Sequence, residues 1–283
     1  MSIVIEHLNY VYMTGGPYET KALSDVNLTI HDGEFIGLIG HTGSGKSTLV
    51  QHLNGLIMPT SGRVLVDGMD LADKGTDRRA VRQRVGLVFQ YPENQLFEET
   101  VEKDIAFGPK NLGLDDAEID RRVRDAMRRV ALDYDRLHER SVFELSGGQM
   151  RRVAIAGVLA MKPDVIILDE STAMLDPSGR REVMNTVHRL NREEGISVVI
   201  ITHYMAEAAT ADYVIVMDEG KIAMSGTPRE VFTKVEKMRA LGLDVPEMTD
   251  LAHMLRGDGV AVRADILTVD EMVEEVCRLS SNT

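Results

Sequence analysis

A glycine-rich stretch close to the N-terminal end leaves few folds open to this chain. Residues Gly40-His-Thr-Gly-Ser-Gly-Lys-Ser47 fit the pattern G-x-x-x-x-G-K-[ST], in which backbone N–H groups surround a phosphate. Glycine has no Cβ, so successive N–H groups can turn towards one anion. The apolar run Glu34–Gly40 precedes this loop and a helical pattern over Lys46–Leu56 follows it. The sequence therefore predicts strand, phosphate loop and helix, the start of an α/β fold.

The whole loop is predicted to bind a nucleotide, through Gly40, His41, Thr42, Gly43, Ser44, Gly45, Lys46, Ser47 and Thr48. We expect Lys46 to reach the outer phosphates, Ser47 to bind Mg²⁺ through its hydroxyl, and Thr48 to hold the loop at the helix N-terminus. The alternative is a glycine-rich turn that binds nothing.

Three further apolar runs end in polar residues: Val85–Gln90, Val165–Asp169 and Val198–His203. Such runs are typical of buried parallel strands. Ligands of open α/β sheets bind at the carboxyl ends of the strands. We therefore expect the polar residues there to converge on the phosphate loop: Gln90, Asp169, Glu170 and His203.

These residues suit phosphoryl transfer. Because neighbours on an extended chain point to opposite sides, Asp169 is predicted to face the metal and Glu170 the attacking water. His203 could bond the γ-phosphate or that water, and Gln90 could bind Mg²⁺ or sense the γ-phosphate. The alternatives are a structural histidine and a polar strand end. The predicted catalytic residues are thus Lys46, Gln90, Glu170 and His203, with Ser47, Gln90 and Asp169 as metal ligands.

Composition limits the possible partners. The net charge of -13 argues against a main role in binding nucleic acid or an anionic membrane surface. A local cluster, Arg121 to Arg129, lies among apolar residues at helical spacing, which predicts a solvated helix face. Cys277 is the only cysteine, which suits a reducing compartment such as the cytoplasm. The chain begins without a secretory-signal pattern, and no apolar run approaches the ~18 residues of a membrane span.

The remaining patterns divide the chain. A charged, helical stretch over about 91–161 predicts a helical subdomain within a domain of residues 1–226. Asp218-Glu-Gly-Lys221 predicts a hairpin turn. Thr227-Pro-Arg-Glu230 and Thr268-Val-Asp-Glu271 are helix-capping patterns, so residues 227–283 are predicted to form a small helical extension.

A second glycine turn, Leu145-Ser-Gly-Gly-Gln149, matches the signature motif of ATP-binding cassette (ABC) proteins. The other family motifs accompany it in order over roughly residues 1–225: the phosphate loop, Gln90, Val165 to Glu170, Met174-Leu-Asp176 and Thr202-His203. This resemblance implies a RecA-like P-loop core with N-terminal antiparallel strands and a helical signature subdomain. It also implies that two cassettes hold two ATP molecules between them. In the family the signature, here Ser146, Gly147, Gly148 and Gln149, caps the partner's ATP.

The same resemblance assigns two further residues. Tyr12 would stack on adenine, with a half-buried strand tyrosine as the alternative, and Asp176 would lie at the dimer seam.

Local motifs narrow the class of ABC protein. The stretch between Lys46 and Ser146 is too short for the long coiled coils that chromosome-maintenance ATPases place between phosphate loop and signature. The chain also has one cassette, whereas the translation-factor relatives have two. The Gly15-Gly-Pro17 insertion, Gln51-His-Leu-Asn54 and the stretch Gln90–Gly108 resemble the energy-coupling factor (ECF) transporter ATPases, more the second of their two paralogues. Ser171, where many cassettes have proline, and Met174, as in the first paralogue, depart from that pattern.

The ECF resemblance implies an ATPase that powers uptake of vitamins or transition-metal ions from the cytoplasmic face of the cell membrane, as a peripheral protein. Its partners would be a paralogous ATPase or a second copy of itself, a transmembrane coupling subunit and a substrate-binding membrane S component, with no nucleic acid. The alternatives are an ABC importer for amino acids or metals and a soluble regulatory ATPase.

The segment Gln90–Phe97 is the hypothesised contact with the membrane partner, with Tyr91, Leu96 and Phe97 expected near the surface. The alternative is local packing of those side chains.

Overall fold

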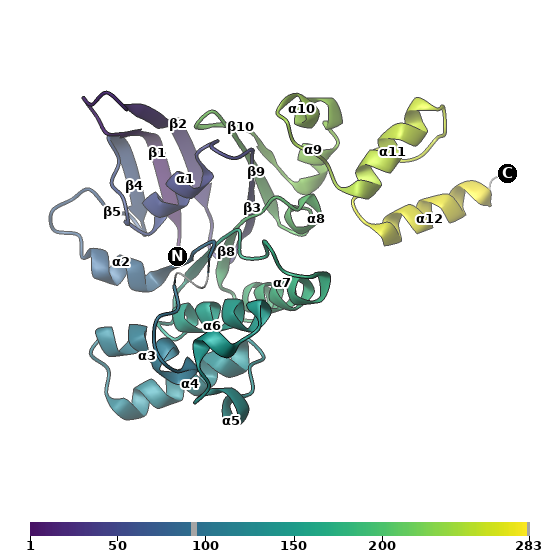
Figure 1. Ribbon diagram of the computed structural model, residues 1–283. Coiled ribbons are helices and arrows are strands. Elements are labelled where there is room, and N and C mark those ends of the chain that lie inside the picture. Colours follow the sequence, from purple (N-terminus) through teal and green to yellow (C-terminus); the bar gives the residue numbers. More distant parts are fainter. Residues whose placement is uncertain (92–94, 282–283) are drawn as a thin grey trace.

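The computed structural model describes residues 1–91 and 95–281 (Figure 1). Two sheets form its centre. The first is antiparallel, in the order β2-β1-β4-β5, and consists of β1 (Ile3–Tyr12), β2 (Thr20–Ile30), β4 (Ser61–Val66) and β5 (Met69–Asp70).

The second sheet has the order β10-β9-β3-β8-β7-β6. It consists of β3 (Phe35–Ile39), β6 (Val85–Val88), β7 (Val165–Asp169), β8 (Ser197–Ile201), β9 (Tyr213–Asp218) and β10 (Lys221–Gly226). Its strands are parallel except β10, which pairs antiparallel with β9 through the predicted turn after Asp218. The carboxyl ends of the parallel strands therefore share one edge.

Alternate side chains of the central strands enter two different cores. Ile166 and Leu168 pack with the helical side of the molecule, whereas Val165 and Ile167 pack with the antiparallel sheet. A strand buried on both faces needs a continuous apolar run, which is the pattern that the sequence has there. The helices α1 (Lys46–Leu53), α2 (Arg78–Arg84), α7 (Pro177–Arg192) and α8 (Met205–Ala208) complete this part.

A group of helices forms a separate lobe beside the second sheet (Figure 1). It contains α3 (Val101–Asn111), α4 (Asp116–Arg129), α5 (Tyr134–Leu137), a short 3-10 turn (Val142–Glu144) and α6 (Gly147–Leu159). The apolar stripe of α4 is buried, and its arginines pair with nearby acids, among them Arg122 with Glu118 at 2.7 Å and Arg124 with Asp120 at 2.9 Å. The predicted solvated face is therefore confirmed for Arg121, Arg124 and Arg128, which are exposed. It is wrong for Arg122 and Arg129, which are only 12% and 13% exposed.

The C-terminal region contains α9 (Pro228–Phe232), α10 (Val235–Ala240), α11 (Glu247–Gly257) and α12 (Val269–Ser280). Thr227 and Glu230 cap α9 reciprocally, as predicted. Thr268 caps α12, but Glu271 accepts a hydrogen bond from the Leu267 N–H at 2.7 Å instead of closing a second reciprocal cap.

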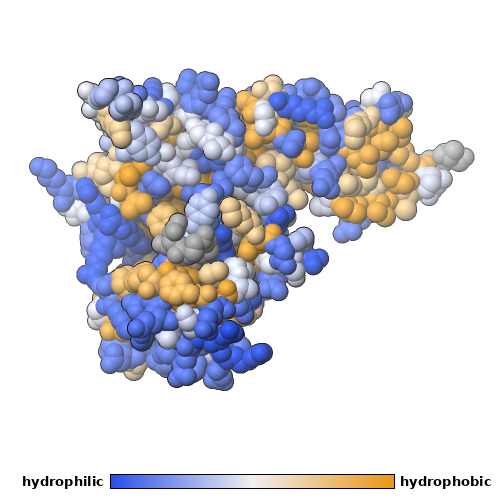
Figure 2. Space-filling model, in the orientation of Figure 1, coloured by the Kyte–Doolittle hydropathy of each residue, from blue (hydrophilic) through white to orange (hydrophobic). Residues whose placement is uncertain are grey.

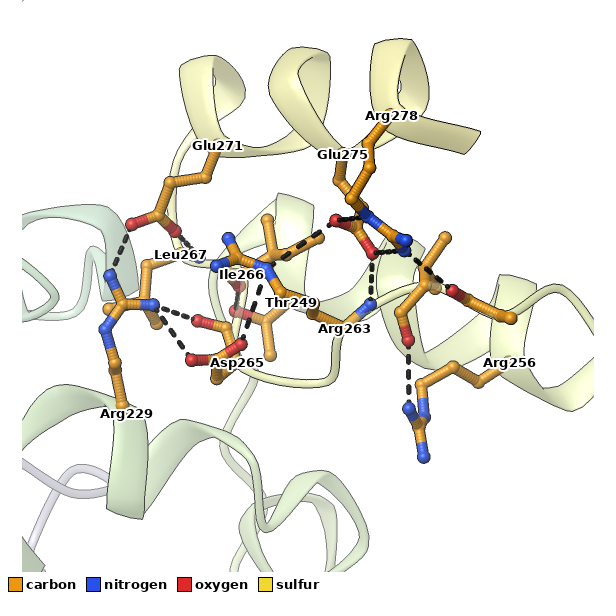
Figure 3. A network of polar contacts seen from close by, with 12 residues as sticks. Arg229, Thr249, Arg256, Arg263, Asp265, Ile266, Leu267, Glu271, Glu275 and Arg278 are labelled. Atoms are coloured by element: carbon orange, nitrogen blue, oxygen red, sulfur yellow. Dashed lines mark hydrogen bonds and ion pairs between the residues drawn. The ribbon is translucent and has the colours of Figure 1, made fainter. Parts of the chain in front are cut away.

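Polar contacts tie α11 and α12 to the loop that joins them, and α12 to α9 (Figure 3). Arg229 of α9 pairs with Glu271 and donates to the Asp265 carbonyl at 2.5 Å. Glu275, 3% exposed, accepts from the Arg263 N–H at 2.8 Å and from Arg278 Nε through its other oxygen at 2.9 Å. Figure 2 shows apolar side chains over α11 and α12, and Val269, Val273 and Val276 of α12 are exposed.

No helix in the part of the chain that the structure describes is long and apolar enough to cross a membrane.

Candidate functional site

The phosphate loop joins β3 to α1 and depends on its glycines. Gly40, Gly43 and Gly45 have φ values of 154°, 85° and 100°. A Cβ on Gly40 would lie 2.4 Å from the Met217 carbonyl oxygen, and one on Gly45 would lie 2.7 Å from that of Ala22. Backbone from two other strands therefore excludes side chains at these positions.

Lys46 lies across this loop and is 5% exposed. Its Nζ donates to the carbonyl oxygens of Gly40 at 2.7 Å and His41 at 3.0 Å. Burial lowers the pKa of the ammonium, while the carboxylates of Glu170 and Asp169 oppose that change. A partly desolvated cation held at a glycine-rich loop is suited to binding phosphate.

Asp169 is the last residue of β7 and is buried. Burial raises the pKa of its carboxyl group, and a hydrogen bond from the Ser47 hydroxyl opposes the rise. The predicted metal ligands Ser47 and Asp169 thus touch one another.

Glu170 connects three segments that are far apart in the sequence. Its Oε2 accepts from Gln90 Nε2 at 2.6 Å, and its Oε1 lies 2.7 Å from His203 Nε2. The prediction that Asp169 and Glu170 point to opposite sides assumed that both lie on an extended strand. That assumption was wrong, because Glu170 has a φ of 49° and follows the end of β7. The left-handed residue turns this carboxylate towards the phosphate loop while Asp169 stays in the sheet.

Most of the predicted site residues enclose one cavity of about 420 Å³, but Gly40, His41, Ser44 and Asp169 are not among the residues that line it. It is lined by Tyr12, Thr20, Lys21, Ala22, Thr42, Gly43, Gly45, Lys46, Ser47, Thr48, Gln90, Glu170 and His203. The Tyr12 hydroxyl lies 3.1 Å from Thr48 Oγ1, and the tyrosine is 39% exposed at the rim. Gln90, Glu170 and His203 therefore converge on the phosphate loop as the sequence predicts, and Asp169 touches the loop through Ser47.

The signature residues lie elsewhere. Ser146 caps α6 and Gln149 completes a reciprocal cap. Ser146, Gly147 and Gly148 line a separate cavity of about 400 Å³ that also contains Asp176, whose Oδ1 accepts from the Gly179 N–H at 2.8 Å. None of the residues that line this second cavity lines the first. The two glycine turns thus line different cavities, and a smaller cavity of about 140 Å³ between them is lined by both Gln90 and Gly147.

Two residues at the site were missed by the sequence analysis. Arg151, 4% exposed, donates to the carbonyl oxygens of Phe89 at 3.1 Å and Gln90 at 2.7 Å, which ties α6 to the Gln90 segment. Glu207, 5% exposed, accepts from Thr172 at 2.8 Å and Thr202 at 2.6 Å. In the sequence, each residue is a charged side chain at a position of a helix that is buried, and this pattern could have pointed to both.

The hypothesised contact segment is corrected at one residue. Leu96 is only 4% exposed and belongs to the core of the helical lobe, whereas Tyr91 and Phe97 are exposed. Three residues of the segment, 92–94, lie outside the described residues. Phe97 lines an apolar cavity of about 370 Å³ between α2 and the helical lobe, with Phe107 and Met161. Its ring meets that of Phe107 edge to face at 4.7 Å.

Comparison with known proteins identifies the family. The family model described as ABC transporter matches residues 23–173. The chain is 50% identical over 283 residues to the "Energy-coupling factor transporter ATP-binding protein EcfA2" of Clostridium perfringens (strain 13 / Type A), covering 100% of this chain and 99% of that protein. It is 51% identical over 274 residues to EcfA1 of Caldanaerobacter subterraneus subsp. tengcongensis, and the match covers 96% of this chain and 98% of that protein.

The chain belongs to the energy-coupling factor transporter ATPases. As an ABC ATPase of this family it binds nucleotide and couples ATP hydrolysis to transport. The predicted resemblance to the second paralogue is confirmed by the EcfA2 relatives, of which that of Symbiobacterium thermophilum is 55% identical over 277 residues, covering 98% of this chain and 96% of that protein.

Solved structures confirm the predicted ABC-type α/β fold of this ECF ATPase. The structure of cbiO1 from Clostridium perfringens, described as part of the ABC transporter complex cbiONQ, is similar with a TM-score of 0.75 and 39% identity, covering 90% of this chain and 98% of that one. A dimeric post-hydrolysis state of the ATP-binding cassette MJ0796, bound to ADP and Pi, is similar with a TM-score of 0.72 and 29% identity. The match covers 80% of this chain and 98% of that one.

Proposed function

We propose that this ECF ATPase pairs with a second cassette to hold two ATP molecules, and that its hydrolysis powers uptake of a vitamin or transition-metal ion. The partners are a paralogous ATPase or a second copy, a transmembrane coupling subunit and a substrate-binding S component at the cytoplasmic face of the membrane. The observation that carries the proposal is the separation of the phosphate cavity from the signature cavity. A signature that lines no part of its own chain's phosphate cavity is available to a partner's nucleotide.

The signature has suitable chemistry for that task. The Ser146 hydroxyl accepts from the Gln149 N–H at 3.3 Å, so its own proton remains available to donate. The first N–H groups of α6, at Gly147 and Gly148, have no helical acceptor and attract anions. The ADP- and Pi-bound MJ0796 relative is dimeric, which supports the pairing.

Hydrolysis requires positioning of water and stabilisation of charge. Glu170 is the proposed base that orients the attacking water. Gln90 and His203 each hold one oxygen of its carboxylate, which fixes the direction of the side chain. Lys46 would leave the loop carbonyl oxygens and bind the outer phosphates, and the aromatic ring of Tyr12 at the rim would stack on adenine.

Magnesium suits the donor atoms present. The Ser47 hydroxyl, the Asp169 carboxylate and the Gln90 amide oxygen are hard oxygen ligands of the kind that Mg²⁺ prefers. Gln90 uses its amide nitrogen for Glu170, which leaves the oxygen for a metal. When bound, Mg²⁺ neutralises charge on the phosphates. In the described residues no three acidic, histidine or cysteine side chains could hold a metal among themselves, so phosphate oxygens would complete the ligand set.

The apolar cavity beside Phe97 is the proposed docking site for the coupling subunit. It lies between α2 and the helical lobe, and Arg151 connects that lobe to Gln90 in the phosphate cavity. Closure of the two cassettes around ATP would move the lobe and thereby the docked membrane helices.

A pull-down tests this proposal. Tagged Glu170→Gln protein would be captured from membranes of the source cell with MgATP, since loss of the water-orienting carboxylate should stall the closed state. Partners would be identified by mass spectrometry. Recovery of a paralogous cassette, a coupling subunit and small substrate-binding membrane proteins is expected. Recovery of a conventional permease, or of no membrane protein, would contradict it.

A further inference from the structure

The His41 side chain of the phosphate loop has an acceptor at each ring nitrogen. Its Nδ1 lies 2.8 Å from the Thr42 carbonyl oxygen, and its Nε2 lies 2.9 Å from Asp218 Oδ1. A carbonyl and a carboxylate oxygen can only accept hydrogen bonds. Neutral imidazole carries one N–H and could satisfy one of these acceptors. The imidazolium carries two, so this geometry favours the protonated ring.

Asp218 is the last residue of β9, and the turn that follows it is packed against the phosphate loop. The turn between β9 and β10 donates from the Gly220 N–H to the Ser44 carbonyl oxygen at 3.0 Å. At the start of the loop, the Met217 carbonyl of β9 leaves no room for a Cβ at Gly40. The His41–Asp218 pair therefore joins two segments whose backbones already touch.

We propose that the protonated His41 ring, held between Asp218 and the Thr42 carbonyl, fixes the phosphate loop and thereby strengthens binding of the magnesium nucleotide. The ring does not itself line the nucleotide cavity, whereas Thr42 does. His41 thus acts as a positioning residue of the loop. The proposal rests on the proposed nucleotide site and adds to it a dependence of affinity on pH.

The surroundings of His41 set the direction of this dependence. The hydrogen bonds to the Thr42 carbonyl and to Asp218 raise the pKa of His41, while slight burial and the Lys46 ammonium lower it by less. Asp218 on the β9 side and Lys46 on the α1 side are the charged groups that act most on the ring. Since the charged form is favoured, the cation is present at and below the ordinary histidine pKa and is lost as pH rises through the raised one. Nucleotide affinity should fall over the same interval.

Binding of a non-hydrolysable ATP analogue in excess Mg²⁺ tests this, measured by calorimetry from about pH 6 to about pH 9, which spans the titration of histidine. The variants are His41→Asn and Asp218→Asn. The control is His7→Asn, because His7 Nδ1 contacts Asp25 Oδ1 at 2.8 Å in a similar pair that lies outside the phosphate loop. His7 has a φ of 49°, which asparagine tolerates.

For the wild-type chain and the His7→Asn control, we expect affinity to fall by roughly three- to tenfold across this pH range, the net size of one hydrogen bond that holds the loop. The His41→Asn variant should bind more weakly at low pH and lose this dependence. In Asp218→Asn the fall should move to lower pH. A dependence that persists unchanged in His41→Asn would overturn the proposal.

An NMR titration of the histidine Cε1–Hε1 signals gives an independent answer without nucleotide. The signal that is missing from His41→Asn belongs to His41, and it should titrate above the ordinary histidine value and shift downwards in Asp218→Asn. Titration at or below the ordinary value would overturn the proposal. Nucleotide binding that is independent of pH would overturn this proposal alone, whereas no binding by the wild-type chain at any pH would overturn the proposed function with it.

Discussion

Glu170 is the residue on which the proposed chemistry depends most. Its carboxylate is held between Gln90 and His203 at hydrogen-bond distance on both sides. The sequence placed Glu170 at the edge of the sheet, because it follows a buried strand. Its left-handed backbone could not be predicted, since the pairing of its N–H with the Ile201 carbonyl at 3.0 Å depends on a strand that comes much later in the chain.

We predict that Glu170→Gln lowers kcat for ATP hydrolysis by roughly 10²- to 10⁴-fold, the usual contribution of a positioned general base. Nucleotide affinity should be retained, because glutamine keeps the size and the hydrogen-bonding ability of the side chain. The measurements are steady-state hydrolysis by the assembled complex and analogue binding. The matched control is Glu139→Gln, at a side chain that is 88% exposed. A Glu170→Gln complex that hydrolyses ATP at the wild-type rate would exclude Glu170 as the base.

The buried Glu207 carboxylate makes contacts that could not be predicted from the sequence. Its Oε2 accepts hydrogen bonds from Thr172, two residues after Glu170, and from Thr202, immediately before His203. Arg180 of α7 lies 3.8 Å from the other oxygen and stacks on the Tyr204 ring. The carboxylate thus joins three segments, and only the folded chain brings them together.

Substitution of Glu207 by alanine should lower the free energy of unfolding by about 2–4 kcal/mol, because two buried threonine hydroxyls would lose their acceptor. Urea denaturation followed by circular dichroism measures this. Glu207→Gln keeps an acceptor oxygen and should be destabilised less. Equal stability of the wild type and the alanine variant would show that the network is not needed for folding.

Among the elements, the strands were easier to predict than the surfaces between them. A continuous apolar run such as Val165–Asp169 identifies a strand buried on both faces, and its end then identifies the site. The exposure of Leu96 and Phe97 depends on how the helical lobe packs. The leucine enters the core of that lobe, and the neighbouring phenylalanine lines the apolar cavity. Adjacent apolar residues in a loop give no local signal of which one is buried.

Phe97→Ser should uncouple transport from hydrolysis, because Phe97 is 56% exposed and contributes an aromatic wall to the proposed docking site. We expect ATP hydrolysis of the reconstituted transporter to be retained and substrate uptake to fall at least severalfold. Met69→Ser, at another exposed apolar residue outside this cavity, is the control. Uptake at the wild-type level by the Phe97→Ser transporter would exclude this surface as the coupling contact.

The C-terminal extension offers a test of the contacts in Figure 3. Glu275→Ala removes the acceptor for Arg278 and for the Arg263 N–H, so α11 and α12 should become more accessible to protease. The adjacent Glu274 is exposed, and Glu274→Ala should leave the cleavage rate unchanged. The measurement is the rate of limited proteolysis within residues 247–281. Equal rates for the two variants would mean that Glu275 does not stabilise the extension.

At the scale of the whole molecule, the central claim is that one chain contains two half-sites. The phosphate cavity and the signature cavity have no lining residue in common. The sequence showed both glycine turns. Their separation in space could be expected from the family resemblance alone, since no local pattern states how far apart two loops will lie.

The most direct test is the oligomeric state of Glu170→Gln protein with saturating MgATP, measured by light scattering after size-exclusion chromatography, alone and with its paralogous cassette. A second protein carries Gly148→Asp in addition. A Cβ at Gly148 would meet Gly179 Cα at 3.8 Å, an ordinary contact, so the chain can fold while its signature carries a negative charge. The account predicts an ATP-dependent dimer that Gly148→Asp prevents without loss of nucleotide binding. A Glu170→Gln protein that stays monomeric in both mixtures, or a Gly148→Asp protein that dimerises equally well, would contradict it.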